Sequence, residues 1–139
     1  MPEAFALRIV TPEQSLLDER VLSVRAAAVD GQLGLLVRHA PMLAELVIGE
    51  LIVRDPVGRA RHFAMTGGVL RVERDGVTVL ADAAEEAQQI DVERARMALE
   101  RAQERLHRPT GAPGVDLTRA ELALARALNR LKVAGRAGQ

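Results

Sequence analysis

The stretch VLRVERDGVTVLADAAEEA (residues 69–87) contains two β-branched segments followed by a run of alanine and glutamate. Asp75-Gly76 separates "LRVER" from "VTVL", and Asp-Gly between two strand-like segments is a strong signal for a tight β-hairpin. After Leu80 the composition changes to residues that favour helix. The stretch therefore predicts that a β-domain ends near here and that a helical region follows it.

Upstream of this hairpin, residues 4–81 have the pattern of a series of short strands. In "AFALRIV" (4–10), Phe5, Leu7 and Ile9 fall on one face of a half-buried strand. The runs "VLSVRAAAV", "LGLLV", "ELIVR", "RHFAM", "VLRVE" and "VTVLA" follow, with turn signals at Asp30-Gly31, Pro56-Val57-Gly58 and Gly67-Gly68. Short strands without intervening helices predict an antiparallel β-sandwich or flattened barrel, which we place at residues 1–84.

Downstream, residues 85–139 are expected to form an antiparallel two-helix hairpin. The first helix has Asp91 as its N-cap and ends at Pro109, while "AAEEAQQ" (83–89) is consistent with either helix or linker. "PTGAPG" (109–114) is a loop, and the second helix runs from a cap at Asp116 to a stop at Gly135. The fold class is therefore mixed: a β-sandwich followed by an αα-hairpin.

The two helices are a near-repeat, offset by 25 residues. "IDVERARMALERAQERL" (90–106) and "VDLTRAELALARALNRL" (115–131) are identical at nine of seventeen positions. In each, apolar residues recur at alternating spacings of three and four, as in helices that pack closely together. These seam residues are Val92, Ala95, Leu99, Ala102 and Leu106, and then Leu117, Ala120, Leu124, Ala127 and Leu131.

Arginines form a second stripe, about 100° around each helix from its seam. They are Arg94, Arg101 and Arg105 in the first helix and Arg119, Arg126 and Arg130 in the second. Antiparallel helices that meet through equivalent seams place both stripes on one face of the hairpin. Arg126 and Arg130 have no acidic residue three or four positions away, so their own helix offers them no salt bridge. Such a face is either solvated or binds an anionic ligand or an acidic partner.

Composition argues against several functions. The chain has 139 residues, 48% hydrophobic and 27% charged, with 19 basic and 19 acidic residues and no cysteine. Neutral charge and only two aromatic residues disfavour nucleic-acid binding. His39, His62 and His107 lack metal-site spacing and no catalytic motif occurs, so we expect a binding or regulatory protein and no enzyme. Without an apolar run of ~20 residues or a signal peptide, a cytosolic protein is expected.

Four segments in order resemble the epsilon subunit of bacterial F-type ATP synthase. They are "DGQLGLLVRHAPMLAEL" (30–46), "TGGVLRVERDGVTVLADAAEEA" (66–87), "IDVERA" (90–95) and "RAELALARALNRL" (119–131). The resemblance covers residues 4–134, with one departure: Arg38 stands where the family usually has glycine. It implies a non-catalytic rotor subunit of a proton-translocating complex, peripheral to the cytoplasmic face of the bacterial membrane and touching it only through the c-ring.

The resemblance also implies contacts for each part of the chain. The sandwich would meet the gamma subunit and the c-subunit ring through Arg38, His39, Ala40, Pro41 and Met42. The hairpin would be a brake on ATP hydrolysis that, when extended, meets the beta subunit through Arg119, Arg126 and Arg130. When compact it would bind ATP as a regulatory ligand, with no cofactor required, through Glu85, Ile90, Asp91, Arg94, Ala95, Arg101, Arg126 and Arg130.

A second interpretation belongs to another functional class. In it, the chain is a free-standing module whose basic hairpin binds RNA or an acidic protein. A steep salt dependence of RNA binding would favour this interpretation, because each phosphate contact releases counterions. The neutral net charge and the scarcity of aromatic residues count against it.

Overall fold

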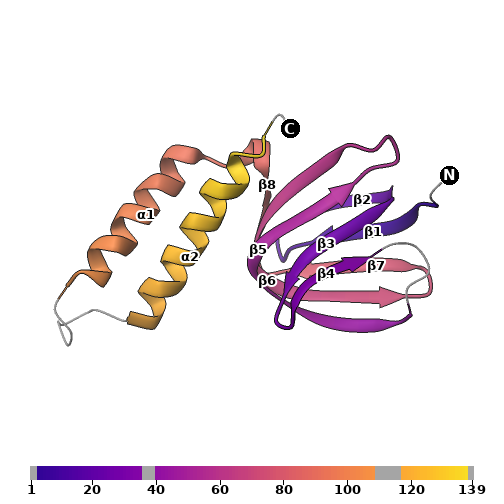
Figure 1. The fold of residues 1–139 in the computed structure, drawn as a ribbon, viewed down its shortest axis with the longest axis horizontal. Helices are drawn as coiled ribbons and strands as arrows, with labels where there is room; N and C mark the ends of the chain where they lie inside the picture. The colour runs from indigo at the N-terminus through magenta and orange to yellow at the C-terminus, as the bar shows by residue number, and fades with distance from the viewer. Residues whose placement is uncertain (1–2, 36–39, 109–116, 138–139) are drawn as a thin grey trace.

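The computed structural model describes residues 3–35, 40–108 and 117–137, and consists of a β-sandwich with a helical hairpin at its side (Figure 1). The strands are β1 (Phe5–Val10), β2 (Ser15–Val21), β3 (Ser23–Ala28), β4 (Gly31–Leu35), β5 (Met42–Arg54), β6 (Ala60–Glu73), β7 (Gly76–Ala81) and β8 (Ala84–Glu86). The helices are the 3-10 turn η1 (Ala87–Gln89), α1 (Val92–Leu106) and α2 (Leu117–Ala134). The predicted fold class is confirmed.

The strands follow the order β2-β1-β7-β6-β5-β3-β4, and β8 pairs with β6 beyond the end of β7. All neighbours are antiparallel except β1 and β7, which run parallel. β5 and β6 are the longest strands, at 13 and 14 residues, and pair along their whole shared length. They form the ribbon on which both the sandwich core and the helical hairpin are built.

The core-facing side of β6 changes along the strand. Phe63 and Met65 point into the core in its first half, and Leu70 and Val72 in its second, so the parity shifts between them. The shift occurs at the pair Gly67-Gly68, whose φ angles are 119° and 147°. Glycine adopts such angles without steric cost. The turn predicted at these glycines is therefore wrong: they bend one continuous strand.

The predicted hairpin at Asp75-Gly76 is present, with its two-residue turn at Arg74-Asp75. Gly76 opens β7 with φ 149°, and a Cβ there would lie 2.5 Å from the carbonyl oxygen of Ala6 in β1. The close approach of β1 thus explains the glycine better than the turn does. In β1 the predicted inward residues are all buried: Phe5, Leu7 and Ile9. The sequence pattern missed β2, where the charged run "DER" breaks the alternation of apolar residues.

Residues 84–86 correct the sequence-based prediction for the junction. The composition favoured helix or linker, but these residues form β8, with Ala64 of β6 opposite Glu85 in register. The exposed edge of β6 beyond β7 needs a hydrogen-bonding partner, and this requirement overrides the helix propensity of alanine and glutamate. β8 thereby extends the sheet to within a few residues of the start of the hairpin.

The two helices pack as expected through small residues. Asp91 caps α1, its Oδ1 accepting a hydrogen bond from the backbone N–H of Arg94 at 3.0 Å. The four seam alanines are all buried: Ala95, Ala102, Ala120 and Ala127. Val92 and Leu117, at the ends of the predicted seams, stay about 40% exposed. α2 ends just before Gly135 as predicted, while its predicted cap Asp116 lies outside the described residues.

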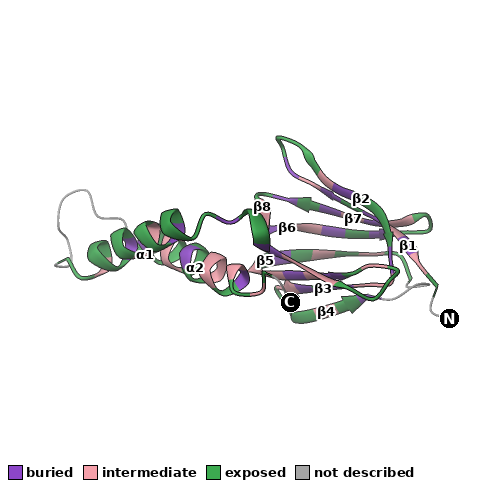
Figure 2. Ribbon diagram, turned by 90° about the horizontal axis from the view of Figure 1, so that it is seen from above, coloured by how far each residue is buried: buried purple, intermediate pink, exposed green. Residues whose placement is uncertain are grey.

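α2 lies between α1 and the sandwich and makes most of the hairpin's contacts with β5, β6 and η1 (Figure 1). Val133 is its fully buried residue there, packed with Ala64, Ala87 and Ile90. Met97 and Leu122, which point away from the seam between the helices, are exposed. Much of the rest of the hairpin surface is also exposed (Figure 2). No helix in the described ranges is both long and apolar enough to cross a membrane.

Candidate functional site

A hollow of about 430 Å³ lies where the two helices meet the sandwich. Its walls come from three parts of the chain: the start of α1, the middle of α2, and the β6–β8 edge. The residues that line it are Thr66, Glu85, Arg94, Ala98, Ala123, Arg126, Ala127 and Arg130. Because hairpin and sandwich both contribute, the hollow has all its walls only when α2 is docked.

Helix geometry explains how three arginines reach one hollow. Arg126 and Arg130 are four residues apart on α2, about one turn, so they share a face. Arg94 lies in the first turn of α1, which runs alongside the later part of α2 because the helices are antiparallel. Between them the small side chains of Ala98 and Ala123 leave a shallow apolar surface. The predicted single arginine face is therefore present for these three residues.

Arg130 already has an anionic partner. Its Nε donates to Glu85 Oε1 at 2.7 Å, and a second nitrogen contacts Oε2 at 3.2 Å, in a bidentate pair that is half-buried. Among the described residues, Arg94 and Arg126 have no such partner for their guanidinium groups. Three cations and one carboxylate leave this hollow with a net charge of +2. It is suited to a ligand with several negative charges.

Strand alternation fixes the position of Glu85. Consecutive residues in a strand point to opposite faces, so Glu85 faces α2 while Glu86 faces the sandwich. Glu86 forms a bidentate pair with Arg61 of β6, with both N···O distances at 2.9 Å. These hydrogen bonds raise the pKa of Arg61 above its ordinary value despite partial burial. β8 is thereby held on β6, and it presents Glu85 to Arg130.

Comparison with known proteins gives the family. Residues 4–87 match the model of the ATP synthase delta/epsilon chain β-sandwich domain, and residues 88–135 match that of its long α-helix domain. The chain belongs to the ATP synthase delta/epsilon chain family. Members of the epsilon type are non-catalytic subunits of ATP synthase, and this chain is one of them.

Curated relatives cover most of the chain. The ATP synthase epsilon chain of Geotalea daltonii is 41% identical over 139 residues, covering 100% of this chain and 99% of its own. That of Carboxydothermus hydrogenoformans is 50% identical over 111 residues, covering 79% and 81%. A chain of the Euglena gracilis mitochondrial ATP synthase has the same fold, with a TM-score of 0.80 at 24% identity, covering 96% of this chain and 82% of that one.

Of the epsilon-type residues predicted to bind ATP, the structure brings four into the hollow: Glu85, Arg94, Arg126 and Arg130. Ile90 and Ala95 are buried and Asp91 caps α1, so these three hold the start of α1 in place. Arg101 is exposed and does not line the hollow; it lies seven residues beyond Arg94, about 10 Å further along the axis. Arg119 is also exposed and outside it.

Thr66 and the three alanines were missed from sequence. Thr66 is on β6, far from the helices in the chain, and no local pattern marks it as a neighbour of Arg126. The alanines were assigned to packing alone, or not assigned at all. A signal was available for Ala98 and Ala123: they fall on the arginine side of each seam in the aligned repeat, at equivalent positions.

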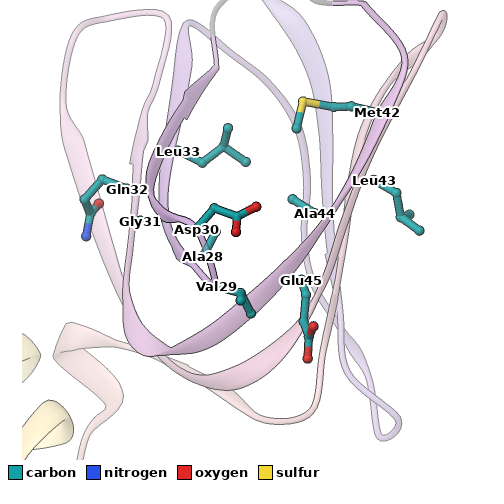
Figure 3. A pocket seen from close by; sticks show the side chains of 10 residues that line it. All are labelled: Ala28, Val29, Asp30, Gly31, Gln32, Leu33, Met42, Leu43, Ala44 and Glu45. Carbon is teal, nitrogen blue, oxygen red and sulfur yellow. The ribbon is translucent and has the colours of Figure 1, made fainter.

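The residues predicted to contact the rotor are only partly described. Ala40 and Pro41 are exposed and Met42 is half-buried at the start of β5, while Arg38 and His39 lie outside the described residues. Next to this segment is a second hollow, of about 250 Å³, between the β3–β4 turn and β5 (Figure 3). Leu33 and Met42 project into the space between the strands, and Leu43 points away to the outside (Figure 3).

Proposed function

We propose that this chain is the central-stalk rotor subunit of a bacterial F-type ATP synthase and that its hairpin is a nucleotide-sensitive brake on ATP hydrolysis. The convergence of Arg94, Arg126 and Arg130 in one hollow between hairpin and sandwich carries the proposal. Membership of the ATP synthase delta/epsilon chain family indicates the complex in which the chain works. In it, the protein is peripheral, at the cytoplasmic face of the membrane, and reaches the membrane only through the c-ring.

The outer face of the sandwich carries exposed leucines beside the charged residues Glu45 and Arg71. Leu43 of β5 and Leu80 of β7 are 69% and 44% exposed. Strand parity and register place both on the outer face of the β5–β6–β7 sheet, where Val69 lies opposite Leu80. Exposed apolar patches mark protein contact sites. We assign this face, together with the predicted contact residues at 38–42, to the gamma subunit and the c-ring.

Two states of the hairpin follow from how it is held. In the docked state, α2 covers part of β5 and β6, and Glu85 neutralises Arg130. In the released state, Arg119, Arg126 and Arg130 meet an acidic segment of the beta subunit and block hydrolysis. Residues 87–91 are the short connection between the two domains, so the hairpin moves as one body about them.

ATP matches the docked hollow in charge and size. Its triphosphate complements a net charge of +2, and arginine binds phosphate oxygens in bidentate fashion. The volume falls in the range of small-molecule sites, roughly 300–1,000 Å³. The surface of Ala98 and Ala123 gives the base an apolar wall. Since ATP contacts both domains at once, its binding favours the docked state. The hairpin then stays away from the catalytic head and does not inhibit hydrolysis.

Calorimetric titration of ATP into the isolated protein tests the ligand. We expect saturable heat at millimolar ATP or below, and weaker binding of AMP, because AMP lacks two of the phosphate groups that the arginines would hold. AMP is thus the matched control for the base and ribose. An absence of heat at millimolar ATP would contradict the ligand assignment.

Removing residues 88–139 tests the brake. The cut falls after β8, so the Arg61–Glu86 pair and the sandwich are kept. We expect the assembled complex to hydrolyse ATP severalfold faster at low ATP, because the inhibitory helices are gone, with little change at high ATP, where they are already docked. The measurement is ATPase rate against ATP concentration for complexes with the complete and the shortened chain. Equal rates at low ATP would rule the brake out.

A further inference from the structure

α2 is held on the sandwich at a second place, away from the arginine hollow. The side-chain amide of Asn129 donates to the backbone oxygen of Gly49 at 2.9 Å and lies 3.4 Å from that of Met65. Gly49 and Met65 are register partners on β5 and β6, so one amide group contacts both strands. A Cβ at Gly49 would lie 2.6 Å from the Cβ of Ala27, so β3 fixes this part of β5 closely.

An ion pair lies further along the same helix face. Just beyond the end of α2, Arg136 Nε donates to Glu50 Oε2 at 3.3 Å, and the same oxygen lies 2.9 Å from His62 Nδ1. The Glu50 side chain is only 11% exposed. A carboxylate with so little access to water needs positively charged or hydrogen-bonding partners. Docking of α2 supplies one of them.

Between these two polar contacts, Val133 fills an apolar site. It is fully buried against Ala64, Ala87 and Ile90. Asn129, Val133 and Arg136 are spaced by four and three residues, which places them on one face of the helix. By the 3.6-residue period, Asn129 and Arg136 are turned by roughly 60–120° from Arg126 and Arg130, and Val133 by roughly 20–60°. None of the three lines the hollow, so they hold the helix from outside it.

We propose that Asn129, Val133 and Arg136 form a clasp that holds α2 docked without any ligand and so sets the resting strength of the brake. The proposal rests on the proposed function, because the docked state is the one in which the brake is off. The clasp fixes how often α2 opens, whereas the arginine hollow fixes how far ATP reduces that opening. The two effects belong to different residues and can be separated by mutation.

Because the chain has no cysteine, a single introduced thiol can be used to measure how often α2 lifts from the sandwich. Ala64→Cys places a single thiol beneath Val133, where a thiol reagent reaches it only when α2 lifts. We call this thiol the docking reporter, and its labelling rate, relative to the same reaction in the unfolded chain, gives the opening equilibrium. Val79→Cys, in the sandwich core, is the core reporter and measures global unfolding in the same way. Each clasp substitution is combined with each reporter in turn, in the complete chain.

We expect Asn129→Ala and Arg136→Gln each to raise labelling of the docking reporter by about five- to tenfold without ATP, since the first removes the amide contacts to Gly49 and Met65 and the second the ion pair with Glu50. Saturating ATP should still slow labelling by the same factor as in the parent. Lys132→Gln is the matched control for Arg136→Gln, because Lys132 is exposed at the same end of α2 and carries the same charge. It should leave the rate unchanged.

The outcomes separate the two proposals. Labelling of the docking reporter within twofold of the parent in both clasp variants would overturn the clasp. So would an equal rise at the core reporter, because the residues would then serve global stability. If ATP fails to slow labelling in the parent itself, the ligand assignment is lost while the clasp stands or falls on the rates without ATP. Arg126→Gln, by contrast, should lose the ATP effect and keep the resting rate.

Discussion

Arg126→Gln is expected to weaken ATP binding to the isolated protein by roughly 10- to 100-fold, the loss of a charge-assisted hydrogen bond to phosphate. Arg126 is the cleanest choice among the arginines of the hollow. Its guanidinium is exposed and has no ion pair with the described residues, so the fold loses little when the charge is removed. Arg130→Gln would also leave Glu85 without its cation.

Arg105→Gln is the matched control, since Arg105 belongs to the same stripe and is also exposed but lies outside the hollow. It changes the net charge by the same amount. We expect it to bind ATP as the parent does, in a calorimetric titration at fixed ionic strength. If Arg105→Gln and Arg126→Gln weaken binding equally, the arginines act only through overall charge and the hollow is not the site.

Gly68→Ala is expected to lower the free energy of unfolding by about 3 kcal/mol or more, or to prevent folding. The added Cβ would lie 2.2 Å from the carbonyl oxygen of Leu80 and 2.9 Å from the Cα of Ala81, both backbone atoms of β7. It would also force alanine to a φ of 147°. Relief requires β7 to separate from β6 at the place where β6 changes its core-facing side.

Urea unfolding followed by far-ultraviolet circular dichroism measures this effect, because the chain has no Trp or Tyr for fluorescence. Gly34→Ala is the control: nothing lies within 4 Å of a Cβ at that position. We expect it to change stability by no more than about 0.5 kcal/mol. Similar unfolding midpoints for the two variants would show that Gly68 is not a steric requirement of the fold.

The features that local periodicity controls were predictable from sequence. The alternation of Phe5, Leu7 and Ile9, the cap at Asp91 and the buried alanine seams depend on neighbours a few residues away, and all are present. Repetition of the helix pattern also placed Arg94, Arg126 and Arg130 on one side. These contacts follow from helix and strand geometry alone.

The features that distant segments control were not predictable. Gly67-Gly68 is equally consistent with a turn or a bend, and only the approach of β7 decides between them. β8 has the composition of a helix, yet the unpaired edge of β6 draws it into the sheet. The acid that Arg130 lacks within its helix is Glu85, 45 positions earlier. No local pattern gives such a pairing.

In the mechanism that we propose, the junction at residues 87–91 makes the hairpin a lever. β8 is fixed to the sheet by Glu86, so the pivot lies just after it, and Ile90 in that pivot packs against Val133 of the clasp. α1 has 15 residues and extends about 22 Å from this point. In the opening motion that we propose, a force at the far end of α1 therefore acts on the clasp over a long arm, and opening the clasp takes less force there than at the pivot.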